Sequence, residues 1–115
     1  MSTIQPIKTA TGNTRAFVLN WPTLANGDDG EPIAFSQYTD KSAQVVGTFG
    51  TGGVLALEGS NNGADWAVLT DPQGNPLNFT AAKIEMVAEA TAFVRPRVLA
   101  GDGSTSLSLI LLLKE

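Results

Sequence analysis

Apolar and polar residues alternate along most of the chain, in short runs separated by Gly, Asn, Asp and Pro. A period of two places every second side chain on the same face of an extended strand, so the pattern predicts β-structure. The last run is the clearest, and its inward face is formed by Leu107, Leu109, Leu111 and Leu113. Ser106 and Ser108 lie on the other face, where Ile110 and Leu112 interrupt the polar pattern. Both faces of this strand are therefore expected to be covered.

Seven or eight strands are predicted, each bounded by turn residues. Six runs are clear, at residues 15–21, 43–49, 53–58, 65–70, 91–99 and 106–113, and a stretch at 3–9 and a weaker run at 33–38 complete the set. No repeat or linker divides the 115 residues, a length that suits one domain with one core. We expect one antiparallel, jelly-roll-like β-sandwich spanning residues 1–115.

One segment favours a helix instead. Thr80 is a suitable N-cap, and the sequence AAKIEMVAEA that follows is rich in helix formers, with Ile84 and Val87 three residues apart. The sequence therefore predicts one short helix at residues 81–88. At about two turns, it would depend on packing against the sandwich.

The stretch LEGSNNGADWAVLTDPQGNPL, residues 57–77, predicts two turns. Asn and Gly of SNNG suit a hairpin, and Asp71-Pro72-Gln73-Gly74 has the residue preferences of a type I turn. Trp66 is in phase with Val68 on one face of the second hairpin strand, and a large aromatic residue in that position is expected in the core.

Composition excludes several classes of partner. The chain has a net charge of -4 and only seven scattered Lys and Arg residues, which argues against nucleic acid. It lacks the basic start of a secretory signal and a run of roughly 18 apolar residues, so we expect no membrane span and synthesis in the cytoplasm. A 43% hydrophobic and 16% charged composition favours contact with other protein.

The chain has no histidine and no cysteine, which removes the usual general base and the commonest metal ligands. Asp28, Asp29 and Glu31 in the loop NGDDGEP leave open a carboxylate pair or a Ca²⁺ site, although acidic residues in such loops are usually solvated turn formers. We predict no catalytic, cofactor-binding or metal-binding residues, and we do not expect an enzyme.

Arg95 and Arg97 flank Pro96, so both side chains lie on the same face of one strand. Because proline has no N–H, we expect this strand at a sheet edge or a bulge. Two outward guanidinium groups suit bidentate contacts with a partner's carboxylates. The alternative is a local pairing with Glu85 or Glu89.

Further partner contacts are expected at both ends of the chain. Residues 1–10 would form an extended N-terminal arm that docks on a neighbour through Ile4 and Ile7. Ile110 and Leu112, on the second face of the last strand, would be covered by another subunit of a symmetric oligomer.

The string LEGSNNGADWAVLTDPQGNPLNFTAA, followed by FVRPRV, resembles small structural proteins of tailed bacteriophages, in particular head decoration or cement proteins. The resemblance covers residues 54–98. It implies a virion protein on the outer capsid surface whose partners are the major capsid protein and its own copies. Because such proteins often sit at three-fold positions, a trimer is preferred to a dimer. The implied role is to stabilise the assembled head by bridging capsid subunits.

A second resemblance competes with the first. Hairpins of the form S-x-D-G-x-x-W occur in discoidin-like carbohydrate-binding modules, although Asn62 stands here where Asp is usual and the chain is shorter. This resemblance implies a carbohydrate-binding β-sandwich of a phage tail or other surface appendage, with Trp66 as an exposed platform for a sugar ring.

Overall fold

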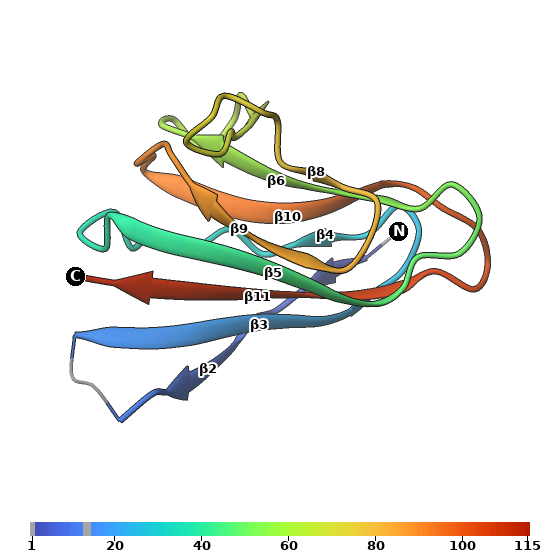
Figure 1. Ribbon diagram of the computed structural model, residues 1–115, viewed down its shortest axis with the longest axis horizontal. Helices are drawn as coiled ribbons and strands as arrows, with labels where there is room; N and C mark the ends of the chain where they lie inside the picture. Colours follow the sequence, from blue (N-terminus) through green and yellow to red (C-terminus); the bar gives the residue numbers. More distant parts are fainter. Residues whose placement is uncertain (1, 13–14) are drawn as a thin grey trace.

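The computed structural model describes residues 2–12 and 15–115, which form two mostly antiparallel β-sheets and contain no helix (Figure 1). The six-stranded sheet has the order β1 (Thr3–Ile4), β4 (Asp29–Gly30), β10 (Phe93–Ala100), β6 (Val54–Ser60) and β7 (Ala67–Val68), and β8 (Asn78–Phe79) also pairs with β6. The five-stranded sheet has the order β2 (Ile7–Ala10), β3 (Ala16–Leu24), β11 (Ser106–Lys114), β5 (Asp40–Thr48) and β9 (Lys83–Val87). The predicted all-β, sandwich-like architecture is confirmed.

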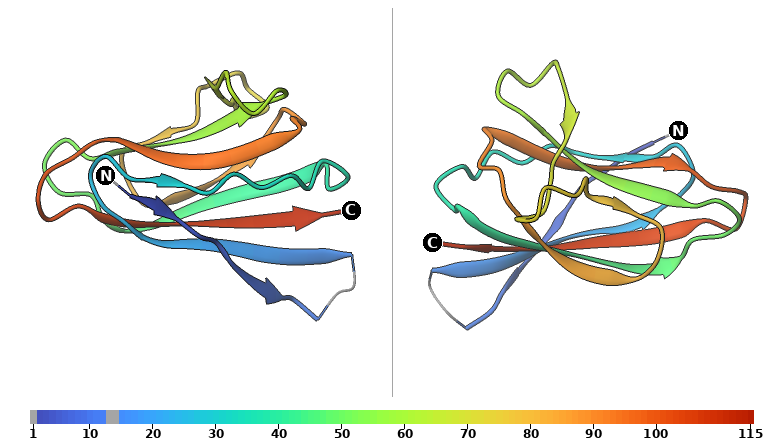
Figure 2. Two further views of the ribbon diagram at one scale, coloured as in Figure 1. Left: turned by 180° about the vertical axis from the view of Figure 1, so that it is seen from behind. Right: turned by 45° about the horizontal axis from the view of Figure 1, so that its top comes forward.

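The core lies between the two sheets, whose arrangement is shown from two further sides in Figure 2. The alternation of β11 is confirmed, because its four odd-numbered leucines are buried against residues of the six-stranded sheet. The largest fully buried side chains include Trp21, Phe79, Leu24, Leu55 and Leu57. Both sheets contribute to this one cluster, so burial of apolar surface between them is the main stabilising term.

A β-bulge in β3 places two large residues in the core. Trp21 is opposite Leu109 of β11, whereas Leu24 is opposite Leu107, so β3 has one extra residue between these pairs. Thr23 takes a left-handed conformation there, with a φ of 52°. Residues three apart on a regular strand would lie on opposite faces, and the bulge is what lets Trp21 and Leu24 both point inward.

Pro96 lies in an interior strand, so the expected edge position was wrong: β10 pairs with β6 on one side and β4 on the other. On the β4 side, the N–H groups of Val94 and Val98 donate to backbone carbonyls at 3.1 and 2.9 Å. Pro96 lies midway between them and in phase with them, so its nitrogen also faces the β4 side, and the ladder lacks one donor there. Gly30 fits there because a Cβ atom on it would lie 2.6 Å from the Pro96 ring and from Trp21.

The predicted helix at residues 81–88 is not seen, and β9 occupies most of the segment. β9 pairs with β5 in antiparallel register, with Val87 opposite Lys41 and Ile84 opposite Gln44. Val87 is buried, whereas Ile84 and Met86 are exposed, which is the period of a strand. Two turns of helix are marginal alone, and strand pairing with β5 outweighs the helical propensity.

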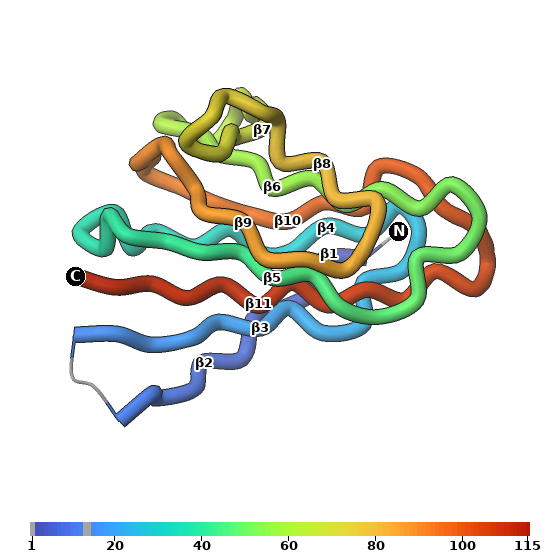
Figure 3. The backbone as a smooth tube through the Cα atoms, in the orientation of Figure 1, coloured from blue at the N-terminus to red at the C-terminus, as the bar shows by residue number. Residues whose placement is uncertain are grey.

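The remaining strand predictions are confirmed in part. β6 and β7 form the predicted hairpin, and the N–H of Gly74 donates to the Asp71 carbonyl at 2.9 Å in the predicted turn. Residues 33–38 form no strand and contribute one bridge, between Ile33 and Val94. Figure 3 traces the N-terminal segment from β1 in one sheet to β2 in the other. No helix among the described residues is long and apolar enough to cross a membrane.

Candidate functional site

The outward surface of the five-stranded sheet is largely apolar. Register pairing places two rows of side chains on it, one running Ile7, Asn20, Ile110, Gln44 and Ile84, and the other running Thr9, Val18, Leu112, Ser42 and Met86. We name the apolar members of these rows the outer apolar face, which consists of Ile7, Val18, Ile84, Met86, Ile110 and Leu112. Ile7, Ile84 and Met86 are 57%, 59% and 52% exposed.

Ile110 and Leu112 lie at the centre of the outer apolar face, on the opposite side of β11 from the core leucines, as the sequence predicts. Ile84 and Met86 were missed as partner-binding candidates because their segment was expected to be helical. Their period of two was present in the sequence and would have placed both residues on one face of a strand. Beside Met86 and Leu112 the face is hollowed into a cleft of about 190 Å³, which is also lined by Ser42 and by the charged residues Asp40, Lys41 and Lys114.

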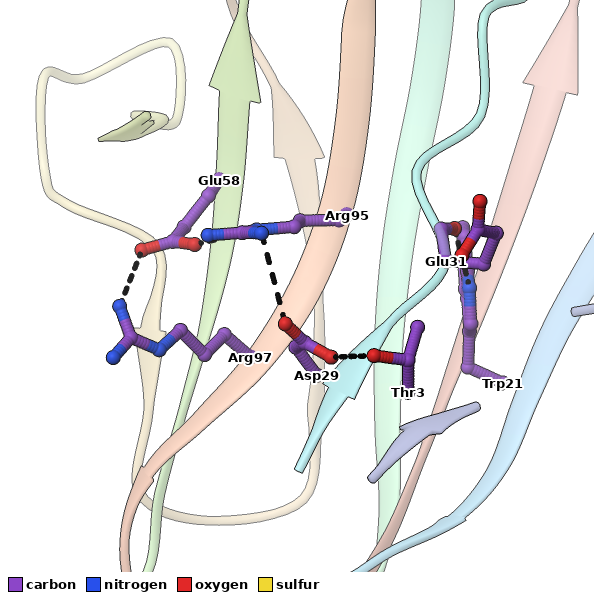
Figure 4. Close-up of polar contacts among 7 residues, drawn as sticks. All are labelled: Thr3, Trp21, Asp29, Glu31, Glu58, Arg95 and Arg97. Atoms are coloured by element: carbon purple, nitrogen blue, oxygen red, sulfur yellow. Dashed lines mark hydrogen bonds and ion pairs between the residues drawn. The ribbon is translucent and has the colours of Figure 1, made fainter. Parts of the chain in front are cut away.

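The arginine pair lies on the outward surface of the six-stranded sheet (Figure 4). The Arg95 Nε atom donates to Glu58 Oε1 at 3.0 Å, and its Nη1 atom is 3.6 Å from Asp29. Arg97 is 3.9 Å from Glu58 and its side chain is 49% exposed, against 18% for Arg95. The predicted shared face is confirmed, but the local alternative named the wrong carboxylates. Arg97 is the guanidinium that a partner can reach.

Trp66 lies on the same outward surface and is not a core residue, so that prediction was wrong. Its ring packs on Arg95, with the guanidinium carbon 4.1 Å from the ring centroid. The in-phase residue Val68 is opposite Glu58, which fixes this face of β7 as the outward one, and Leu69 is the neighbour that enters the core. Alternation indicated which residues share a face, whereas the pairing with β6 decides which face is buried.

The acidic loop is occupied by structural contacts. The buried Asp28 carboxylate accepts hydrogen bonds from the N–H groups of Ser2 and Ala25, at 2.8 and 2.9 Å. Asp29 accepts a hydrogen bond from the Thr3 hydroxyl as well as contacting Arg95. Within residues 2–12 and 15–115, no three acidic side chains are grouped as a metal site would require.

The two predicted N-terminal anchors lie in different places. Ile4, in β1, packs against the core from the edge of the six-stranded sheet, and β1 pairs in parallel with β4. Ile7, in β2, lies opposite Asn20 at the edge of the outer apolar face. The segment is therefore extended, as predicted, and pairs with its own chain. Its docking on a neighbour stays a prediction.

Two surface loops are fixed by carboxylates whose pKa values are lowered. The Asp102 pKa lies below its usual value because the Ser104 hydroxyl and the Thr51 and Ser104 N–H groups donate to this carboxylate. The Asp71 pKa is lowered chiefly by the N–H of Asn75. Charged carboxylates thus act as hydrogen-bond acceptors that order the turns.

Comparison with known proteins identifies no family. No protein-family model and no curated protein matches the chain. Its structure is similar to that of protein NMB1881 from Neisseria meningitidis, with a TM-score of 0.45 and 13% sequence identity, over 96% of this chain and 84% of that chain. A likeness at this level identifies neither a family nor an activity.

Proposed function

We propose that the chain is a virion structural protein of a tailed bacteriophage, a decoration or cement protein that binds the outer surface of the assembled head. It stabilises the head by bridging subunits of the major capsid protein. Such a protein acts by mass action, because it binds the assembled shell and not the dissociated subunits. The resemblance of residues 54–98 to decoration proteins is the starting point of this proposal.

The observation that carries the proposal is the outer apolar face. A sandwich needs only one apolar face per sheet, and the outward face of an antiparallel sheet is usually polar. Here the six side chains of the outer apolar face lie on the outward side of the five-stranded sheet, three of them more than half exposed. A contiguous exposed apolar surface marks a protein contact, so the function of this chain is assigned to binding protein.

Connectivity supports the proposal at the level of fold. Successive segments from β3 to β6 alternate between the two sheets, as do β9, β10 and β11, and the sheets have the orders β3-β11-β5-β9 and β4-β10-β6-β7. We propose that this is a jelly roll, with β1 and β2 added at the edges. Jelly rolls serve in viral capsid proteins and also in lectins, so the fold agrees with the proposal without selecting it.

Capsid contact is assigned to Arg97 and to the N-terminal segment. Arg97 is half exposed and only loosely paired, at 3.9 Å from Glu58, so it can turn to a carboxylate of the capsid without leaving a buried charge behind. Arg95 is held by Glu58, Asp29 and Trp66 and has a structural role.

The test uses purified heads that lack the protein. Recombinant protein is added, and its occupancy and the temperature at which DNA escapes are measured. Decorated heads should release DNA at a higher temperature than bare heads, and Arg97→Ala should bind less well than the charge-preserving Arg97→Lys. Equal heat resistance of bare and fully decorated heads would refute the cement role. Absence of the protein from purified virions would refute the virion role altogether.

One observation favours the carbohydrate-binding alternative, in which the chain is a discoidin-like module of a tail or surface appendage. Trp66 lies on the surface, which is a requirement for an aromatic ring that stacks on a sugar. The adjoining loop contains the polar residues Asn61, Asn62 and Asp65. Arg95 covers one side of the ring, which leaves at most one side for a sugar. Glycan-array binding by the wild type that is lost in a Trp66→Ala variant that is still folded would favour this alternative over the cement role.

A further inference from the structure

We propose that the outer apolar face is covered by the same face of a second copy of this chain, in a two-fold symmetric dimer whose five-stranded sheets pack against each other. The inference deepens the proposed function, since it rests on this face being a protein contact. Three properties of the face favour a second copy over any other partner.

The first property is charge. No charged side chain occurs in the two rows that form the centre of the face. Beyond these rows, the only charged residues on the outward side of β5 and β11 are Asp40 and Lys114. These two residues are opposite each other in register, at one end of the face. Their charges are opposite in sign, so the face has no net charge. Two such faces do not repel each other, and a strongly charged partner would gain nothing from this surface.

The second property is area. Five strands about 4.8 Å apart and about six residues along each strand give roughly 500 Å² in projection, and side-chain relief makes the accessible area larger. Specific interfaces bury about 800 Å² per partner, and weaker ones begin below about 600 Å². One face covered by its copy is therefore of the size of a small, reversible dimer interface.

The third property is that the two rows complement each other. A two-fold axis that crosses β11 at Leu111 lays the first row of one copy over the second row of the other. Ile110 then meets Leu112 of the second copy, and Ile84 meets Met86. Gln44 meets Ser42, so an amide faces a hydroxyl with which it can form a hydrogen bond. Aligned packing of sheets at about 30° keeps these pairs as nearest neighbours.

The alternative axis, parallel to β11, is disfavoured by charge. It would lay Lys114 over Lys114 of the second copy, a like-charge contact. The crossing axis moves each Lys114 to the opposite end of the face, over Ser108. It also brings Ile84 of one copy to the cleft beside Met86 and Leu112 of the other, where an apolar side chain can be buried.

An isologous contact of this kind closes as a dimer. The trimer that the resemblance to decoration proteins implies would need a heterologous contact, with a different surface patch on each side. The outer apolar face complements a second copy of the same face, and for this reason we infer a dimer.

The first experiment is sedimentation equilibrium of the full chain, from about 5 µM to about 1 mM, the range expected for reversible association. The wild type should reach twice the monomer mass, and Ile84→Lys should weaken association at least tenfold. Leu99→Lys is the matched control, because Leu99 is an exposed hydrophobic residue of the other sheet, at 45% exposure. Ile84 is 59% exposed, so Ile84→Lys should keep the thermal unfolding midpoint of the monomer.

A second experiment tests the axis and uses the absence of native cysteine. Copies carrying Gln44→Cys and copies carrying Ser42→Cys, distinguished by mass, are mixed and treated with a short bismaleimide. Random pairing of equal amounts would already make half of the cross-linked pairs mixed, so the crossing axis predicts that mixed pairs clearly exceed half of the cross-linked product. A mixed fraction of one half or less would overturn the arrangement.

The inference is overturned if the wild type stays monomeric at the highest concentration, if it forms a trimer, or if Ile84→Lys and Leu99→Lys weaken association equally. None of these measurements involves a capsid. A dimer that fails to bind heads would leave this inference standing and remove the cement role, whereas a monomer that binds and stabilises heads would do the reverse.

Discussion

The guanidinium carbon of Arg95 lies 4.1 Å from the centroid of the Trp66 ring, and the same guanidinium contacts Glu58 and Asp29. Arg95 therefore joins three segments that are distant in sequence: the β6–β7 hairpin, β4 and its own strand β10. Stacking and ion pairing together hold the loop before β7 on the outward surface of the six-stranded sheet.

Removing Arg95 should destabilise the protein much more than removing Arg97. Arg95→Ala leaves Glu58, whose side chain is 7% exposed, without its closest cation, and we expect a loss of about 2 to 3 kcal/mol in the free energy of unfolding. Arg97→Ala removes a long, half-exposed ion pair and should cost less than about 1 kcal/mol. Urea unfolding at neutral pH measures both, and equal losses would contradict the structural role of Arg95.

Strand positions could be predicted from the sequence because alternation is a local property. The β11 pattern alone placed four leucines inward and Ile110 outward, and both assignments are confirmed. The helix prediction for residues 81–88 was wrong because it considered the helix formers within the segment and not the strand that pairs with it. What favours β9 is β5, some forty residues earlier, and no local pattern shows that pairing.

Gly30 should tolerate no side chain. A Cβ atom there would lie 2.6 Å from the ring of Pro96 and from Trp21, both of which are fully buried. We expect Gly30→Ala to lower the free energy of unfolding by about 3 kcal/mol, at the upper end for overpacking, because neither ring can move into open space. Gly103→Ala is the control: nothing lies within 4 Å of its Cβ position, so a change within about 0.5 kcal/mol is expected. Thermal and urea unfolding of both variants measure the difference.

Stability should fall in acid, with Asp102 as one identifiable cause. Its pKa in the folded chain is lowered by the hydrogen bonds from Ser104 and Thr51. The unfolded chain then binds the proton more readily, so this contribution is complete above the unfolded pKa of about 3.9 and is lost as the pH falls toward the folded pKa. Asp71 acts in the same direction. Asp102→Asn should reduce the drop in unfolding free energy between pH 5 and pH 2, and an unchanged pH profile would contradict this assignment.

The sequence predicts which candidate residues share a face of one strand. It does not predict the contacts that depend on how strands pair. Arg95 and Arg97 share a face because they are two residues apart, and the sequence shows this. Their partner Glu58 lies 37 residues before Arg95 and meets it only through the β6–β10 register. The extension of the outer apolar face from β11 to β9 likewise depends on the order of strands in the sheet.

Substitutions at Ile4 and Ile7 should distinguish a residue that stabilises the fold from one that contacts a partner. Ile4 packs against the core, so Ile4→Ala should lower the free energy of unfolding by about 1 to 2 kcal/mol, less than for a fully buried isoleucine. Ile7 is 57% exposed, and Ile7→Ala should change the unfolding free energy by no more than about 0.5 kcal/mol.

If the N-terminal segment docks on a neighbour, Ile7→Ala should reduce head occupancy while Ile4→Ala leaves the occupancy of folded protein unchanged. Urea unfolding and head-binding titrations, each at one temperature, measure the two effects. An Ile7→Ala variant that binds heads as the wild type does would remove Ile7 from the contact surface, and a destabilised one would show that β2 is held by this side chain.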